Sequence, residues 1–176
     1  MKDYGSGMDE LKIGAGVSVA ERARWMPHWK IEKYHGDDVC PENLFEVDEF
    51  DGNCLLNEGI TELLNLLIGG TATAFNNANA YIGIGDSNTA AVASQTGLQA
   101  AVNKLYKAMD GTYPQVLNQT VTFRATFGSS DANFSWQEFT VANGNSDAAK
   151  NLSRKVENHG TKATDTWVVS LTVTIA

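Results

Sequence analysis

The sequence predicts a mainly β fold, namely an antiparallel β-sandwich with one short α-helix and an extended N-terminal arm. Apolar and polar residues alternate over residues 120–127 and 167–175, a spacing typical of half-buried strands. Turn-forming residues separate the apolar segments at short intervals, as they do in sandwich proteins. Only residues 57–70 have convincing helical spacing. A parallel α/β fold is disfavoured because its crossover helices are missing.

The chain of 176 residues is long enough for one compact domain. We expect an arm over residues 1–27, because its first part contains four glycines and buries too little apolar area to fold alone. A single β-sandwich domain is expected over residues 28–176. Trp and Arg are common in interfaces, so the candidate partner contacts at the end of the arm are Arg22, Arg24 and Trp25. Trp25 has a second interpretation, as a cap on the core.

Two strands are expected before the helix, over "HWKIEKYH" and "LFEVDEF". In the second strand Phe45 and Val47 alternate with acids, which predicts one buried apolar face and one wet acidic face. The acids of this region form either a solvated face or a docking surface for a basic partner. Asp48 and Glu49 are the candidate contacts of that docking surface.

The one helix is predicted over residues 58–68. Asn57 is its candidate N-cap, and Gly69 and Gly70 end it. Acids in the first turn and apolar residues at helical spacing support the helix; they are Glu58, Glu62, Ile60, Leu63, Leu64 and Leu67. We expect the leucine face to pack on a sheet.

The chain after Lys104 is strongly β. In the strands over residues 120–127 and 167–175, the odd-numbered side chains are expected to share the buried face. The Gly-Ser-Ser-Asp turn after the first of these strands predicts a hairpin to a strand containing Phe134 and Trp136. A bulge is expected near Gln137 and Glu138, where the apolar phase slips.

Composition disfavours several classes of function. The formal net charge of −8 argues against nucleic-acid binding, which needs clustered Lys and Arg. No apolar run approaches the ~18 residues of a membrane-spanning helix. The N-terminus lacks a signal-peptide core, so we expect neither membrane insertion nor secretion by that route. Cys40 and Cys54 are too few for a disulfide framework or a cysteine zinc site, and two free, partly buried thiols are expected.

The segment "AYIGIGDSNT" has three interpretations: a catalytic serine at Ser87, a phosphate loop, or a turn after a strand. A hydrolase of the Gly-Asp-Ser type needs a late Asp-x-x-His base, but Val156 stands three residues before His159. A phosphate loop needs a further glycine and a lysine that this segment lacks. We therefore expect a turn, with no catalytic residue, no cofactor, no metal site and no enzymatic activity.

Several stretches together resemble a family of small structural proteins of tailed bacteriophages. They are "GNCLLNEGITELLNLLIGG", "FNNANAYIGIGDSNTAAVASQTGLQA", "KLYKAMDGTYPQV", "VTFRATFGSSDANFSWQEFTVANG" and "NLSRKVENHGTKATDTWVVSLTVTIA". The resemblance extends from about Trp29 to the last residue. It implies a non-enzymatic virion component that is made in the bacterial host cytoplasm.

The resemblance leaves the place in the virion open. The first expectation is a capsid decoration or cement protein that binds the major capsid protein and neighbouring copies of itself and so stabilises the head. The second is a tail, baseplate or fibre-associated subunit. The third is a receptor- or glycan-binding module, with an aromatic platform of Tyr106, Tyr113 and Trp136. In each case we expect a homo-oligomer in the virion, without nucleic acid or membrane as partner.

Overall fold

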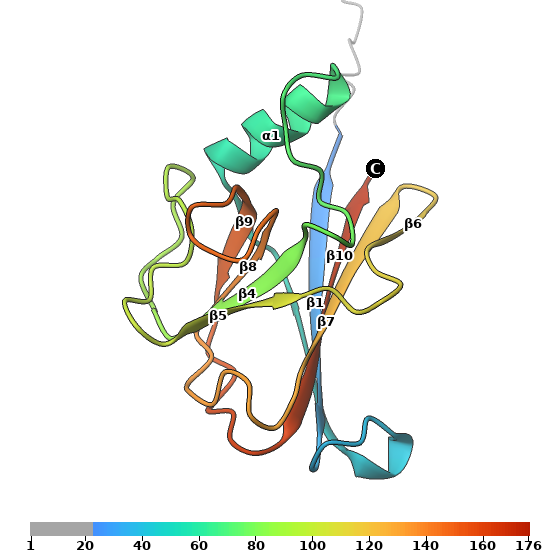
Figure 1. Cartoon of the computed structure of the whole chain (residues 1–176), viewed down its shortest axis with the longest axis vertical. Helices are drawn as coiled ribbons and strands as arrows, with labels where there is room; N and C mark the ends of the chain where they lie inside the picture. The colour runs from blue at the N-terminus through green and yellow to red at the C-terminus, as the bar shows by residue number, and fades with distance from the viewer. Residues whose placement is uncertain (1–22) are drawn as a thin grey trace, which may run out of the picture.

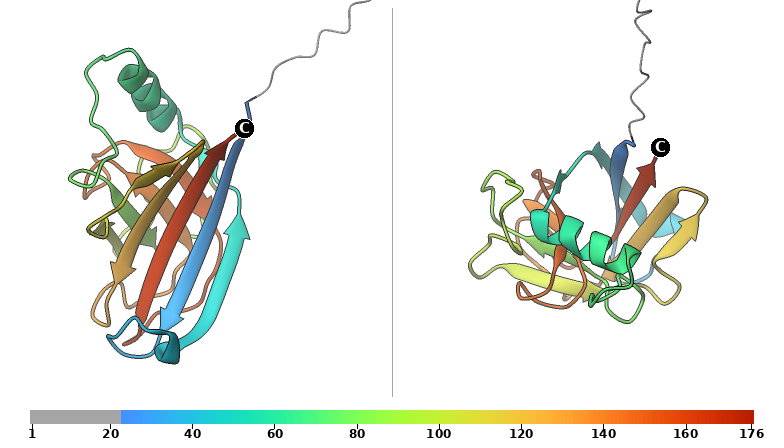
Figure 2. Two further views of the ribbon diagram at one scale, coloured as in Figure 1. Left: turned by 90° about the vertical axis from the view of Figure 1, so that its right-hand side faces the viewer. Right: turned by 90° about the horizontal axis from the view of Figure 1, so that it is seen from above.

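The computed structural model describes residues 23–176, which form two antiparallel five-stranded sheets packed face to face (Figure 1, Figure 2). Sheet A has the strand order β2-β1-β10-β7-β6 and sheet B the order β3-β9-β8-β4-β5. The elements are β1 (Trp25–Tyr34), the 3-10 helix η1 (Pro41–Asn43), β2 (Leu44–Asp51), β3 (Cys54–Leu55), α1 (Asn57–Leu67), β4 (Tyr81–Gly85), β5 (Lys104–Ala108), β6 (Gln115–Leu117), β7 (Thr120–Phe127), β8 (Glu138–Ala142), β9 (Asn151–Val156) and β10 (Thr166–Ile175). The predicted β-sandwich with one short α-helix is confirmed.

The hydrophobic core lies between the inner faces of the two sheets. β10 is the central strand of sheet A, and its Leu171 lies opposite Trp29 of β1 and Phe123 of β7. Ile84 of β4 and Phe139 of β8 belong to the same buried cluster from the side of sheet B. The odd-numbered residues of β10 from 167 to 173 and of β7 from 123 to 127 are all buried. The faces predicted for these two strands are therefore confirmed.

Sheet A begins at Trp25, so residues 25–27 belong to the folded domain and not to the arm predicted over residues 1–27. Arg24 and Ala176 exchange two backbone hydrogen bonds, of 2.6 and 3.2 Å. β1 starts earlier than expected because β10 continues almost to the last residue and offers a partner to all ten residues of β1. Residues 1–22 of the predicted arm lie outside the described residues.

The prediction for the faces of β2 is wrong. Phe45 and Val47 are exposed, whereas Phe50 is buried and Asp48 is half-buried. The register explains the reversal, because Phe50 lies opposite the buried Trp29 and fixes the even-numbered residues on the inner face. β2 is also the edge strand of sheet A, where an apolar side chain on the outer face is left uncovered.

The predicted hairpin after β7 is also wrong. β7 pairs with β10 and β6, and the chain then crosses to sheet B, where β8 begins at Glu138. The buried ammonium of Lys162 shapes this crossing by donating to the carbonyl oxygens of Gly128 (2.7 Å) and Asp131 (2.8 Å). The change of apolar phase near Gln137 marks the start of β8 and not a bulge within a strand.

Helix α1 lies across one end of the sandwich, the end at which the chain also terminates (Figure 1, Figure 2). It extends from Asn57 to Leu67, within one residue of the predicted range at each end. Asn57 is the first helical residue and not the N-cap, a position taken by Leu56. The N-cap prediction was wrong because the side chain of buried Leu56 is required by the core, which outweighs its poor capping propensity.

Candidate interaction surfaces

The Gly83-Ile84-Gly85 segment of β4 is built for close packing and not for phosphate binding. A Cβ atom on Gly83 would lie 2.7 Å from side-chain atoms of both Thr140 and Tyr106. A Cβ atom on Gly85 would lie 2.3 Å from a carboxylate oxygen of Glu138. The two glycines therefore leave room for side chains of the neighbouring strands, which lie across β4.

Ser87 lies in the turn after β4. Its hydroxyl donates to the hydroxyl of Thr89 (3.0 Å) and accepts a hydrogen bond from the Thr89 amide (3.2 Å). His159, the only late histidine, instead bonds Asp48 (3.2 Å) on the inner side of β2. Within residues 23–176, Ser87 thus has the hydrogen bonds of a turn residue and no histidine partner.

A buried ion pair fastens the long loop after β4 to sheet B. The Arg154 Nε donates to a carboxylate oxygen of Glu138 (2.7 Å), and both side chains are fully buried. The same carboxylate accepts the amides of Gln99 (2.9 Å) and Ala100 (2.7 Å). Arg154 also donates to the carbonyl oxygen of Thr89 (2.8 Å). The outer face of sheet B is therefore covered by this loop instead of facing solvent.

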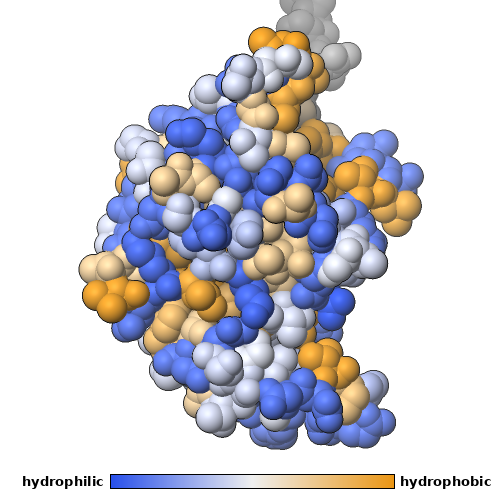
Figure 3. All heavy atoms as spheres, in the orientation of Figure 1, coloured by the Kyte–Doolittle hydropathy of each residue, from blue (hydrophilic) through white to orange (hydrophobic). Residues whose placement is uncertain are grey.

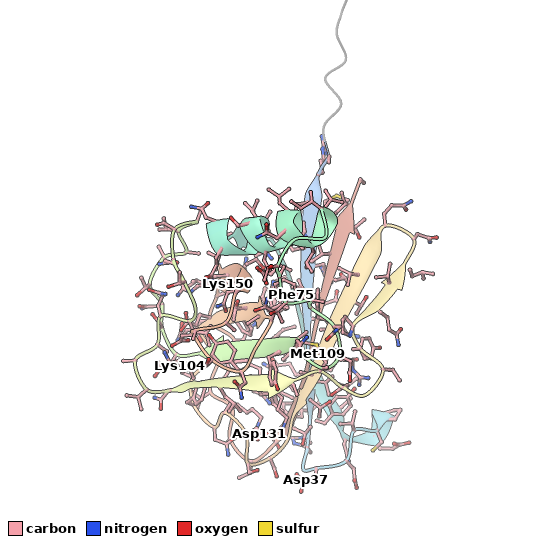
Figure 4. The ribbon with its side chains drawn as sticks, turned by 45° about the horizontal axis from the view of Figure 1, so that its top comes forward. Asp37, Phe75, Lys104, Met109, Asp131 and Lys150 are labelled. Atoms are coloured by element: carbon pink, nitrogen blue, oxygen red, sulfur yellow. The ribbon has the colours of Figure 1, made fainter. Side chains whose placement is uncertain are left out.

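Helix α1 packs on β9 through Gly59 and Glu58, and on the loop after β8 through Glu62. A Cβ atom on Gly59 would lie 2.4 Å from the Leu152 carbonyl oxygen, so the helix approaches the strand backbone very closely. Glu58 accepts the amide of Asn151 (2.9 Å), and Glu62 accepts the side-chain amide of Asn143 (2.8 Å). Lys150 lies next to α1 in the side-chain view (Figure 4), with its Nζ 3.7 Å from Glu58. The prediction that the leucine face packs on a sheet is wrong for Leu64 and Leu67, which are exposed. Only Leu63 packs against the core.

The apolar stripe of α1 is consequently exposed. Relative exposure is 39% for Ile60, 57% for Leu64, 80% for Leu67 and 79% for Ile68, which all lie on one side of the helix. At the same end of the sandwich, Val116 and Leu117 of β6 are 76% and 74% exposed. Figure 3 shows apolar atoms over the C-terminal end of α1 and at the tip of β6. We call these six residues the apolar end.

The apolar end brings two groups of exposed apolar side chains, one from α1 and one from β6, to the same end of the domain (Figure 3). Scattered exposed apolar residues are ordinary, but large ones gathered at one end of a domain usually mark an interaction site. The sequence contained the signal in its leucine spacing, but the spacing alone could not show which side of the helix faces the sheet. Gly59 was the available clue, since a glycine inside a helix allows close approach to another backbone.

The structure separates the predicted contact residues instead of grouping them. Arg22 lies outside the described residues, and Arg24 is exposed. Trp25 is half-buried against the core and its indole donates to the Asn53 side chain (3.2 Å), in agreement with its interpretation as a core cap. Asp48 and Glu49 point to opposite faces of β2, so they do not form one docking surface.

Asp48 points to the inner face of β2, where it forms an ion pair with Lys33. Its carboxylate lies 2.8 Å from the Nζ of the buried Lys33. The same carboxylate lies 3.2 Å from the Nδ1 of His159. Burial alone raises the pKa of Asp48, but the hydrogen bonds from Lys33 and His159 outweigh it, so the pKa lies below its usual value. Glu49, in contrast, is exposed on the outer face opposite Lys30.

Replacing Asp48 with Asn is expected to lower the free energy of unfolding at neutral pH by about 1.5 to 3 kcal/mol, because a buried lysine loses its closest charged partner. Since the folded-state pKa of Asp48 lies below the unfolded-state value, its contribution is complete above that unfolded value of about 3.9 and is lost as the pH falls through the folded-state pKa. Denaturant titrations from pH 7 to pH 3 should therefore show the difference shrinking in acid. Glu49→Gln, the exposed control, should change stability by less than about 0.5 kcal/mol at pH 7. A constant difference for Asp48→Asn across this range would contradict the assignment.

The other candidate features are metal ligands, the two cysteines and the predicted aromatic platform. Residues 23–176 contain no group of three or more His, Cys, Asp or Glu side chains placed to hold a metal ion. Cys40 and Cys54 are both free. The aromatic platform is not formed, because Trp136 is fully buried and the Tyr106 hydroxyl bonds Asp147 (2.7 Å).

No helix within residues 23–176 has the length and apolar character needed to cross a bilayer. Comparison of the chain with protein-family models, with curated proteins and with solved structures gives no match.

Proposed function

We propose that this protein is a bacteriophage virion structural protein, most specifically a capsid decoration protein that binds the major capsid protein and stabilises the head. The observation that carries the proposal is the apolar end, an exposed apolar surface on a domain whose candidate catalytic serine has only turn contacts. The resemblance of the sequence to small structural proteins of tailed phages supplies the biological context.

The architecture suits attachment by one end. Sheet A is held by long strand pairings, and the buried ion pair of Glu138 and Arg154 joins two strands of sheet B to the loop, so the apolar end belongs to an ordered domain. Burial of Leu64, Leu67 and Ile68 against a partner would remove from water the most exposed apolar side chains of the helix. The opposite end of the sandwich remains free to face solvent, as expected of a protein on a capsid surface.

A tail, baseplate or fibre-associated subunit is the second candidate function, because the same apolar end would serve assembly there. Labelling the protein in intact virions distinguishes the two places. Label over the heads supports the decoration role, label confined to the tails supports the second candidate, and absence of label from virions contradicts both. The receptor- or glycan-binding module is disfavoured by the burial of Trp136.

Replacing both Leu64 and Leu67 with Ser is expected to weaken binding to undecorated heads at least about tenfold, because full burial of one leucine side chain is worth about 1.5 to 3 kcal/mol and tenfold corresponds to about 1.4 kcal/mol. Both side chains are exposed, so folding should be preserved. Binding can be measured by co-sedimentation of purified protein with undecorated heads.

Two matched controls accompany this experiment. Val102 is 84% exposed but lies outside the apolar end, so Val102→Ser should bind like the wild type. Ser87→Ala should also bind normally, because its hydroxyl makes only turn contacts. Unchanged binding of the Leu64 and Leu67 double variant would remove the apolar end as the docking surface.

A further inference from the structure

The outer edge of β2 is the longest open sheet edge in the described part of the chain. β2 has eight residues, against five for β5, three for β6 and two for β3, the other strands at sheet edges. Within residues 23–176, no strand pairs with its outer side. Figure 2 shows β2 at the margin of sheet A with no element beside it. An open edge of this length is a template for adding another strand.

The two faces of the sheet beside the edge of β2 differ in the space that they leave for side chains of an added strand. On the outer face, Val47 is 43% exposed. On the inner face, Phe50 stacks on His159 with ring centroids 4.1 Å apart, and Asp48 bonds Lys33. A strand that pairs with β2 therefore needs apolar side chains toward the outer face and small ones toward the inner face.

The N-terminal segment has that pattern of side chains. In "LKIGAGVSVA", residues 11–20, the odd-numbered positions are all apolar: Leu11, Ile13, Ala15, Val17 and Val19. The even-numbered positions after Lys12 are all small: Gly14, Gly16, Ser18 and Ala20. A period of two is that of a strand with two different faces. The segment and the edge are also of similar length.

Charge favours this segment over another β2 as the partner. β2 carries Glu46, Asp48, Glu49 and Asp51, so two β2 edges side by side would bring like charges together. Acidic edge residues are a known protection against such pairing. Residues 11–24 have one acid, Glu21, against three basic residues, Lys12, Arg22 and Arg24.

We propose that residues 11–20 of one copy add as a strand to the outer edge of β2 of a second copy. Val17 and its apolar neighbours then lie beside Val47, and the glycines lie above Phe50 and His159.

The direction of the strands favours a second copy over the same chain. β1 runs antiparallel to β2, so residues 11–20 of the same chain would have to cross the Asp51 end of β2 and pair in parallel, which is the less stable arrangement. Two copies that exchange the segment reciprocally form a closed dimer, whereas a head-to-tail contact generates a ring or a chain of copies.

Disulfide trapping in the full-length chain tests the pairing. In a Cys40→Ser, Cys54→Ser background, a Val17→Cys protein is mixed with a Val47→Cys protein under mild oxidation. We expect a disulfide-linked dimer of the two variants. Replacing the second protein with a Val116→Cys variant, on the β6 edge, should reduce the yield at least about tenfold. Equal yields with both edges, or no dimer, would overturn the proposal.

Two further measurements separate the alternatives. A protein carrying both Val17→Cys and Val47→Cys should form mainly linked dimers and larger species; a linked monomer that persists on dilution would show pairing within one chain and overturn the choice of a second copy. Sedimentation velocity of the unmodified chain should show concentration-dependent association that Ile13→Asp with Val17→Asp abolishes and Met8→Asp preserves. Association unaffected by the paired aspartates would also overturn the proposal. These measurements need no capsid, so their outcome is independent of the proposed docking of the apolar end.

Discussion

Replacing Leu171 with Ala is expected to lower the free energy of unfolding by about 2 to 5 kcal/mol. Leu171 is fully buried on β10, the central strand of sheet A, between Trp29 and Phe123 on the neighbouring strands. Loss of its side chain removes apolar contact and leaves a cavity lined by two aromatic residues that the paired strands hold apart. Urea denaturation at constant pH, followed by tryptophan fluorescence, gives the change directly.

Ser170→Ala is the matched control, because Ser170 is the preceding residue on the same strand and points to the outer face. Its side chain is half-buried, and the change should be about 0.5 kcal/mol or less. Equal losses for the two variants would contradict the assignment of faces on β10. A loss below about 1 kcal/mol for Leu171→Ala would show that the core around it collapses readily.

The strands that the sequence predicted correctly are those in which one physical effect dominates. In β7 and β10 most large apolar residues occupy the odd-numbered positions, and a shift of one residue would move all of them to the outer face. α1 was predicted within one residue for a similar reason, since helical spacing and the two glycines after it agree. In these elements the local spacing of apolar residues was enough to predict the secondary structure.

The predictions failed where contacts distant in the sequence decide the outcome. β2 has apolar residues in both phases, and only the pairing of Phe50 with Trp29 shows which phase is buried. Leu64 and Leu67 of α1 are exposed because Gly59 and Glu58 face β9 and Glu62 faces Asn143 in the loop after β8. The apolar end was missed for this reason. Of the predicted contact residues that the structure describes, Trp25 and Asp48 proved to be held by intramolecular contacts.

The buried pair of Glu138 and Arg154 is the second site at which a large effect is expected. Neither residue belongs to a recognisable motif, and sequence reasoning could not have paired them, because the register of β8 and β9 brings them together. Each is fully buried, and a buried charge that loses its partner is strongly unfavourable. The pair also joins strands to loop, since Glu138 accepts two loop amides and Arg154 donates to the loop at Thr89.

Arg154→Met is expected to lower the free energy of unfolding by about 3 to 5 kcal/mol, because it leaves the Glu138 carboxylate buried without its cation. Glu138→Gln should also be strongly destabilising, because the amides of Gln99 and Ala100 donate to different carboxylate oxygens and a glutamine side chain has only one oxygen to accept them. The double variant should be no less stable than Arg154→Met alone, because neither charge is then left unpaired. The coupling free energy from the four proteins should be about 1 to 3 kcal/mol.

Amide hydrogen exchange separates a local from a global effect of the same variants. Because the Glu138 carboxylate holds the amides of Gln99 and Ala100, Arg154→Met should accelerate exchange across the loop over residues 86–103 more than in β7 and β10, while Leu171→Ala should act on all of them together. Lys155→Met is the control for Arg154→Met, since Lys155 is the next residue but its ion pair, with Glu157, is partly exposed. Additive losses in the double variant, or equal losses for Arg154→Met and Lys155→Met, would show that the buried pair does not fasten the loop to the sheet.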